Sequence, residues 1–155
     1  MKLFAYGTLM TAEGLRAAIG PRADLMVFRV ARLPGWRRVW NAYREDWGGG
    51  VLNLEPAADS SVVGTLIDGL TDEDFVSLDR QESTHLPREQ VYVQPEWGDS
   101  EPAQLYWRRK GNHTGRPSAR YLAVVLERSR QAGAAVFESV NAGSVDAAGQ
   151  PRRFA

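Results

Sequence analysis

One acidic side chain stands on the apolar face of a predicted helix. Phe75, Leu78 and Glu82 lie three and seven residues apart, so all three share the inward face if the helix extends that far. Burial and the negative end of the helix dipole would both disfavour the carboxylate and raise its pKa, which makes it a better proton acceptor. In the alternative interpretation the helix stops at Asp79, and Glu82 is a solvated loop residue with Arg80 as its ion-pair partner. Glu82 is therefore a candidate general base whose role depends on where the helix ends.

A short loop after the first apolar run is the second candidate. Residues 6–9 read Tyr-Gly-Thr-Leu and come at the end of the run at 2–6. If the permissive backbone of Gly7 turns consecutive N–H groups inward, these groups form a site for a carboxylate or an oxyanion. A plain turn explains the same residues, since glycine follows many strands for conformational reasons alone.

Three further side chains carry groups that take part in chemistry in many proteins. Tyr121 heads an apolar stripe on a predicted helix, where it is either a core tyrosine with one hydrogen bond or a donor to a substrate; its spacing favours the core. His85 and His113 lie in predicted loops without a second ligand at metal spacing, so we expect both at the surface.

The composition excludes several classes of protein. The chain has no cysteine, which removes thiolate nucleophiles and thiolate-bound metals. Its 19 lysines and arginines balance 19 acidic residues, so no net charge favours nucleic acid or an acidic membrane surface. The glycine-rich nucleotide loops, the Gly-x-Ser-x-Gly turn and the His-Glu-x-x-His zinc motif are all missing. We therefore expect no metal, no nucleic-acid partner and no membrane contact.

The apolar pattern predicts one domain with several short strands. The chain has 155 residues, of which 43% are apolar, and this suffices for a single core. A turn is expected at Pro34 and Gly35, and a second turn at 59–61 would join two strands into a hairpin. The strands are expected at residues 2–6, 26–39, 51–54, 62–66, 91–93 and 103–107.

Four helical segments are predicted from capping residues and apolar stripes. They begin after Thr11, at Thr71 with Asp74 as its capping-box partner, at Ser118, and at residue 134. Because strands and helices do not alternate regularly, we expect an α+β domain over residues 1–140, with a mostly antiparallel sheet curled into a small barrel and flanked by helices. Residues 141–155 are expected to form a mobile tail.

The first ten residues bear on localisation. They contain one lysine and a short apolar run interrupted by Gly7, which is too short for a signal peptide or a membrane-spanning helix. We therefore expect a cytoplasmic protein.

Five segments, taken together and in order, resemble the γ-glutamylcyclotransferase family, including its γ-glutamylamine type. The resemblance runs over residues 2–133. The most specific feature is the combination of the loop at residues 6–9 with the segment at residues 78–82, in this order and at this separation. The matching segments are Phe4-Ala5-Tyr6-Gly7-Thr8-Leu9, Trp47-Gly48-Gly49-Gly50, Val63-Gly64-Thr65-Leu66, Leu78-Asp79-Arg80-Gln81-Glu82 and Pro117-Ser118-Ala119-Arg120-Tyr121-Leu122.

The resemblance implies a mixed barrel with flanking helices and an enzyme that cleaves γ-glutamyl compounds by internal cyclisation to 5-oxoproline, without metal or organic cofactor. Glu82 matches the family's catalytic glutamate, and Tyr121 matches a substrate-contacting tyrosine. The substrate-cradling loop is matched by Phe4, Ala5, Tyr6, Gly7, Thr8 and Leu9.

The chain departs from the family pattern in two places. Ser83 and Leu86 stand where many members have a glycine and a nearby tyrosine after the glutamate. Thr8 and Leu9 stand where the types that act on glutathione or γ-glutamyl amino acids often have serine and asparagine. The expected partner is thus a small γ-glutamyl compound whose leaving amine the sequence does not specify.

Other interpretations share the same fold. A non-catalytic domain that binds a small ligand or a partner protein is one, with the basic tail at residues 152–154 as a contact. An enzyme that removes a γ-glutamyl protecting group in a biosynthetic pathway is another. The sequence leaves the oligomeric state open, and it leaves open which arginine contacts a substrate among Arg37, Arg38, Arg44 and Arg88.

Overall fold

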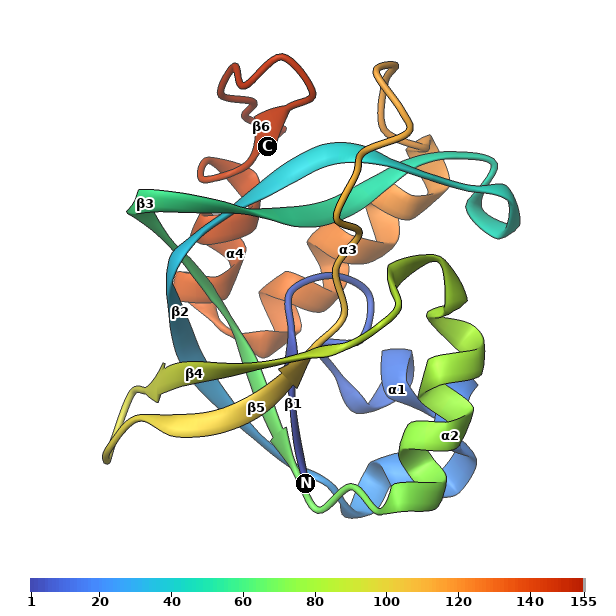
Figure 1. Cartoon of the computed structure of the whole chain (residues 1–155), viewed down its shortest axis with the longest axis vertical. Coiled ribbons are helices and arrows are strands. Elements are labelled where there is room, and N and C mark those ends of the chain that lie inside the picture. Colours follow the sequence, from blue (N-terminus) through green and yellow to red (C-terminus); the bar gives the residue numbers. More distant parts are fainter. Residues whose placement is uncertain (155) are drawn as a thin grey trace.

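The computed structural model describes residues 1–154, and its centre is a five-stranded barrel (Figure 1). The strands follow the order β3-β1-β5-β4-β2, and β2 pairs with β3 to close the barrel. Most pairs are antiparallel, whereas β1 and β5 run parallel. The predicted α+β fold with a barrel-like, mostly antiparallel sheet is confirmed. The strands are β1 (Lys2–Ala5), β2 (Val27–Arg44), β3 (Gly49–Asp68), β4 (Glu89–Pro95), β5 (Glu101–Leu105) and β6 (Val145–Asp146).

Two predictions about turns are wrong. β2 continues through Pro34 and Gly35, where the register against β3 shifts and no turn forms. β3 likewise continues through residues 59–61, so its two halves pair with β2 and not with each other. Long strands of a closed barrel must bend, and a bulge bends a strand without reversing the chain. The chain reverses instead at the 3₁₀ turn η2 (Glu45–Trp47).

The predicted capping residues Thr11, Thr71 and Ser118 each lie directly before a helix and cap it. The Thr71 hydroxyl accepts a hydrogen bond from the Asp74 N–H at 3.2 Å, and the Asp74 carboxylate accepts one from the Thr71 N–H at 2.9 Å. α1 and α2 contact each other at one side of the barrel, and α3 and α4 form a second pair. The helical segments are α1 (Ala12–Ile19), η1 (Gly20–Leu25), α2 (Asp72–Gln81), η3 (Ser83–His85), α3 (Ala119–Ala132) and α4 (Ala134–Asn141).

The hydrophobic core fills the barrel and the space beneath the helices. Leu54 and Leu66 of β3, Leu105 of β5, Leu78 of α2 and Val125 of α3 are all fully buried. Each such side chain contributes roughly 1.5 to 3 kcal/mol by leaving water. The core therefore holds α2 and α3, which carry two of the predicted site residues, against the barrel.

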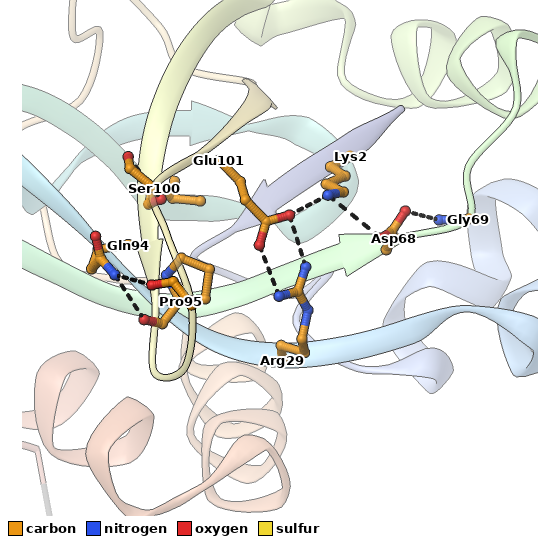
Figure 2. Close-up of polar contacts among 10 residues, drawn as sticks. Lys2, Arg29, Asp68, Gly69, Gln94, Pro95, Ser100 and Glu101 are labelled. Carbon is orange, nitrogen blue, oxygen red and sulfur yellow. Dashed lines mark hydrogen bonds and ion pairs between the residues drawn. The ribbon is translucent and has the colours of Figure 1, made fainter.

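An ion network ties four strands together at the outside of the barrel (Figure 2). Glu101 of β5 accepts hydrogen bonds from both terminal nitrogens of Arg29 on β2, at 2.8 and 3.0 Å, and from Lys2 on β1. Lys2 also lies 3.6 Å from the Asp68 carboxylate of β3. Hydrogen bonds from Arg29 and then Lys2 lower the pKa of Glu101 to about 2.

The C-terminal segment packs against β2. β6 pairs in parallel with Val39 and Trp40, and the Phe154 ring contacts the edge of Trp40 at 5.4 Å between centroids. The backbone N–H of Arg152 donates to the Ser144 carbonyl at 3.0 Å. The mobility expected of this segment stays a prediction. No helix within residues 1–154 combines the length and apolar character needed to cross a bilayer.

Candidate active site

One cavity at the end of β1 collects the residues that the sequence singled out. Its volume, measured as the space open to the centre of a water-sized sphere, is about 40 Å³, and it is partly open to solvent. The loop after β1 forms one wall, and β3, the end of α2, η3 and α3 contribute the others. The predicted site residues that line it are Phe4, Ala5, Tyr6, Gly7, Thr8, Leu9, Glu82 and Tyr121.

Glu82 caps the C-terminus of α2. Its N–H donates to the Leu78 carbonyl at 2.8 Å, and its backbone then leaves the helix. The residue is 7% exposed, and Phe75 and Leu78 are buried beside it on the same helix face. The interpretation of Glu82 as a solvated loop residue is therefore wrong, because the helical register extends far enough to direct its side chain inward.

The carboxylate of Glu82 forms a buried ion pair with Arg44, the last residue of β2. Arg44 Nη1 donates to Glu82 Oε2 at 3.1 Å. Arg80, the partner suggested by sequence proximity, is exposed to solvent. Arg80 and Glu82 are two residues apart at the end of a helix, so their side chains point in different directions. Arg44 lies on a strand that faces the Glu82 side chain.

Burial dominates the electrostatics of Glu82. Removal from water raises the pKa of the Glu82 carboxyl, and the charge of Arg44 lowers it by a smaller amount. The net effect is a pKa above that of an ordinary glutamate. A carboxylate in this environment binds a proton more readily than one at the surface, which is the property required of a general base.

The loop at residues 6–9 has fixed peptide planes and unused donors. The Gly7 carbonyl accepts from the Met10 N–H at 3.4 Å, and the Thr8 carbonyl accepts from Arg128 Nη1 at 2.8 Å. Among the hydrogen bonds within residues 1–154, none has the backbone N–H of Gly7, Thr8 or Leu9 as its donor. Three consecutive N–H groups beside a cavity can bind an anion.

Gly7 is required for a close approach and not for an unusual backbone angle. Its φ is not positive, so other residues could adopt the same conformation. A Cβ at this position, however, would lie 2.7 Å from the Tyr121 hydroxyl oxygen. Conformational freedom, the role expected of this glycine from the sequence, is therefore not what the position requires; the missing side chain gives the Tyr121 hydroxyl room beside the loop.

Tyr121 is both a core residue and a wall of the cavity. Its ring packs edge-on against Trp47 at 5.1 Å and Trp40 at 5.8 Å between centroids. Burial, followed by the negative charge of Glu82, raises the pKa of Tyr121. Its phenol is therefore protonated at neutral pH and can donate a hydrogen bond toward the cavity.

Tyr106, which the sequence did not single out, supports the opposite wall. The Tyr6 hydroxyl donates to the Tyr106 carbonyl at 2.6 Å, and the Tyr106 hydroxyl donates to Asp79 Oδ1 at 2.6 Å. The Asp79 carboxylate also accepts from Arg88 Nε at 2.9 Å. This chain of bonds connects β1 to the end of α2. Its only sequence signal is an aromatic residue at the end of a strand.

His85 lies in the cavity wall, so its predicted place at the surface is wrong. It is 3% exposed, and η3, which carries it, follows directly on α2, with the His85 N–H donating to the Glu82 carbonyl at 2.9 Å. Burial, with smaller contributions from Arg44 and Arg108, lowers the pKa of His85 to about 4. The imidazole is neutral at physiological pH. Its spacing of three residues from Glu82 was the missed signal.

The second histidine packs against an aromatic ring, and the described residues offer no cluster that could hold a metal ion. His113 is half-buried against the Tyr43 ring, and its Nε2 lies 3.1 Å from the Arg116 carbonyl. Within residues 1–154 no three histidine or acidic side chains are arranged so that they could hold a metal ion.

Of the four arginines left open by the sequence, Arg44 alone is part of the cavity wall within residues 1–154. Arg38 lies behind the loop and donates to the Tyr6 carbonyl at 2.9 Å, and its burial lowers its pKa to about 9. Arg37 pairs with Glu55, and Arg88 pairs with Asp79.

A closed five-stranded barrel with this cavity at the end of β1 defines a known class of protein. A family model described as "Gamma-glutamyl cyclotransferase, AIG2-like" matches residues 3–123. Because the match spans most of the chain, the chain belongs to this family.

Solved structures with the same fold include characterised and uncharacterised relatives. An uncharacterised protein from Homo sapiens aligns with a TM-score of 0.74 and 21% identity over 85% of this chain and 79% of its own. A structure titled "Gamma-glutamyl cyclotransferase" aligns with a TM-score of 0.71 and 20% identity over 86% and 80%. A yeast γ-glutamyl cyclotransferase specific to glutathione aligns with a TM-score of 0.61 and 12% identity over 91% and 95%. These similarities establish the fold. A comparison with curated proteins finds no match.

Proposed function

We propose that the protein is a γ-glutamyl cyclotransferase that releases 5-oxoproline from a small γ-glutamyl amine, amino acid or peptide. The observation that carries the proposal is the juxtaposition, in one cavity, of a buried carboxylate of raised pKa and a loop with three N–H donors that bond no acceptor within residues 1–154. Family membership agrees with this reaction.

The substrate supplies its own nucleophile. The α-amine of a γ-glutamyl group reaches the γ-carbonyl carbon through a five-membered ring, and well-oriented intramolecular reactions reach effective molarities of roughly 10⁵ to 10⁸ M. The protein therefore has to hold the glutamyl chain in a folded conformation and move two protons.

Glu82 serves as the general base and then as the general acid. Its carboxylate takes a proton from the substrate's α-ammonium, and the freed amine attacks the γ-carbonyl carbon. The tetrahedral intermediate carries a negative charge on the former carbonyl oxygen and a positive charge on the ring nitrogen, which still bears two hydrogens. Glu82 returns the first proton to the leaving nitrogen, and the C–N bond breaks as the carbonyl re-forms. The ring nitrogen then gives its second proton to the Glu82 carboxylate, which passes it to the released amine, and 5-oxoproline and the ammonium form of the amine depart. The raised pKa of the Glu82 carboxyl lies closer to the pKa values of the α-ammonium and of the leaving amine, between which it moves the proton.

The loop and Tyr121 bind the charges of the substrate. The N–H groups of Gly7, Thr8 and Leu9 bond the α-carboxylate or the oxyanion, and the Tyr121 phenol adds a hydrogen bond. Arg128 and Arg38 hold the loop from outside the cavity through carbonyls of Thr8 and Tyr6. The donors are thus oriented before the substrate arrives, which lowers the cost of reorganisation.

A substrate panel tests the proposal. The purified protein is incubated with γ-glutamyl amines, γ-glutamyl amino acids and glutathione, and 5-oxoproline is measured by mass spectrometry. We expect product from at least one of these classes. If no member yields 5-oxoproline while some of them bind, the protein is a ligand-binding domain of the same fold and the enzymatic proposal is wrong.

A modified substrate tests the role of the loop. Esterification of the α-carboxylate removes the charge that the three N–H groups would bind. We expect the ester of the preferred substrate to lose most of its kcat/KM. Equal turnover of the ester and the free acid would show that the loop does not bind the α-carboxylate.

A further inference from the structure

We propose that Arg44 is a positioning residue for Glu82: fixed by Asp46 on one side, it bonds a single oxygen of the Glu82 carboxylate and holds that group ionised and directed at the cavity. This inference rests on the proposed function, in which Glu82 moves the proton. Arg44 and Asp46 lie outside every segment on which the resemblance depended.

Arg44 divides its donors between two carboxylates. Nε and Nη2 form a fork on Asp46, at 3.0 and 2.7 Å, and Nη2 also donates to the Gln81 carbonyl at 3.2 Å. Nη1 alone remains for Glu82. A guanidinium held by a two-pronged contact has little rotational freedom, so the direction of Nη1 is fixed.

The contact to Glu82 leaves room for proton transfer. Arg44 bonds Oε2, so a proton can bind at Oε1 without breaking the ion pair. The side chains of Arg44 and Glu82 are 12% and 9% exposed, whereas that of Asp46 is 59% exposed. Solvent therefore reaches Asp46 far more readily than it reaches the contact between Arg44 and Glu82.

The turn that carries this arrangement is anchored to α3. Ser118 caps α3 and donates through Oγ to the Trp47 carbonyl at 2.8 Å, and its N–H donates to the Gly50 carbonyl at 2.9 Å. The guanidinium of Arg120 stacks on the Trp47 ring at 4.4 Å and also bonds the Asp46 carbonyl. The same helix carries Tyr121. One helix end therefore fixes both the turn that holds Arg44 and the tyrosine of the cavity.

The surroundings of Glu82 leave Arg44 as its direct cationic partner within residues 1–154. From the β2–β3 turn, Arg44 lowers the pKa of Glu82 and Asp46 raises it; from α2, the Gln81 side chain lowers it. The other titratable groups facing it are uncharged at pH 7, and burial moves the pKa values of the tyrosines up and that of the histidine down, further from pH 7. They are Tyr6 after β1, Tyr106 after β5, Tyr121 from α3 and His85 from η3.

Two substitutions should therefore act with opposite signs. Arg44→Met removes the charge that stabilises the carboxylate, so the pKa of Glu82 rises further. Asp46→Asn removes a negative charge near the Glu82 carboxylate and frees Nε and Nη2 of Arg44 to bond Glu82, so the pKa of Glu82 falls. A residue that merely stabilises the turn would not produce this reversal, since both substitutions loosen the same turn.

The experiment measures kcat/KM for 5-oxoproline release against pH, together with the carboxyl ¹³C titration of Glu82. Arg44→Met should move the acidic midpoint up by at least about one pH unit, since an opposite charge at this distance shifts a carboxyl pKa by roughly 1 to 3. Asp46→Asn should move it down. Arg44→Lys, which keeps the charge but loses the fork, should return the midpoint toward that of the wild type with a lower kcat. Arg37→Met removes an arginine of the same strand that pairs with Glu55 and should change neither readout.

Several results would overturn the inference. Unchanged midpoints in Arg44→Met and Asp46→Asn, or shifts in the same direction, would assign Arg44 a structural role only. If Arg44→Met does not fold, Asp46→Asn still decides: a midpoint that falls supports the inference, and one that stays or rises overturns it. If the wild type releases no 5-oxoproline, the proposed function fails, whereas the carboxyl titration still tests the control of Glu82 by Arg44.

Discussion

Two glutamates of this protein each pair with an arginine, and their acidities move in opposite directions. Glu101 sits in the strand network of Figure 2, where two cations lower its pKa to about 2. Glu82 sits at the cavity, where its pKa is raised despite the bond to Arg44. An ion pair alone therefore does not set the acidity of a carboxyl group.

The difference arises from hydration and from the number of donors. The Glu101 side chain is 21% exposed and accepts hydrogen bonds from Arg29 and Lys2 on both oxygens. Glu82 is nearly out of water and receives one bond from an arginine that is shared with Asp46. Desolvation is the larger effect at Glu82, and hydrogen bonding is the larger effect at Glu101.

The two carboxylates also contribute to stability with opposite signs. The lowered pKa of Glu101 means that its ionised form stabilises the fold, and the raised pKa of Glu82 means that its ionised form costs folding free energy. A strand network can be optimised for stability, whereas a group that must accept a proton cannot be fully stabilised as an anion.

The largest expected effect is that of Glu82→Gln. Glutamine has nearly the same shape but cannot accept the proton, so we expect 5-oxoproline release to fall by roughly 10² to 10⁴-fold, the usual contribution of general acid–base catalysis. Because the ionised carboxylate is costly, the thermal midpoint should stay equal or rise. The two readouts are turnover and a melting curve at pH 7.

A variant that retained most of the wild-type rate would show that another base acts. Glu55 and Glu89 would be the next bases to test, although each pairs with an arginine and neither lines the cavity. Loss of folding together with activity would contradict the claim that Glu82 serves chemistry at the expense of stability.

A smaller effect is expected from Gly7→Ala. The added methyl would lie 2.7 Å from the Tyr121 hydroxyl, so the loop or the ring must move. Displacements of about 1 Å near a reacting group cost up to roughly 10²-fold in rate. We expect kcat/KM to fall by about 10-fold or more.

A double-mutant cycle separates this cause from others. Tyr121→Phe removes the oxygen that the methyl would meet, so Gly7→Ala should cost much less in that background. Additive losses would mean that Gly7 acts through something other than its approach to Tyr121.

The smallest effect on activity is expected from Glu101→Gln, which removes the anion of the strand network. Turnover should be unchanged, and the free energy of unfolding should fall by about 1 kcal/mol at pH 7, since solvent screens such pairs. The folded pKa is lowered, so this stabilisation is present above the ordinary glutamate pKa of about 4.3 and disappears as the pH falls toward about 2. Urea unfolding at several pH values tests it. A loss that persists at the lowest pH would contradict the electrostatic origin.

Local features of the sequence predicted the helices and the position of Glu82 well. The Thr71–Asp74 capping box fixes where α2 begins, and the spacing of Phe75, Leu78 and Glu82 then fixes which way the carboxyl points. These predictions succeed because capping and helical spacing depend on residues within a few positions of each other.

Features that depend on distant contacts were not predictable in the same way. Barrel closure bends β2 and β3 where local rules predict turns, at Pro34 and at residues 59–61. Arg44 reaches Glu82 across 38 positions of sequence, and His85 is buried in the wall of a cavity to which distant segments contribute. Pairing of this kind is decided by how the elements pack and leaves no periodic signal.

The central claim is that burial gives Glu82 the acidity of a working base, and the pH dependence of the wild-type protein tests it most directly. The acidic midpoint of kcat/KM for 5-oxoproline release is compared with the titration of the Glu82 carboxyl ¹³C signal, assigned by its loss in Glu82→Gln. We predict that the two midpoints coincide and lie above the value of about 4.3 typical of glutamate. A Glu82 that titrates at or below that value, or an activity profile that does not follow its titration, would contradict the account.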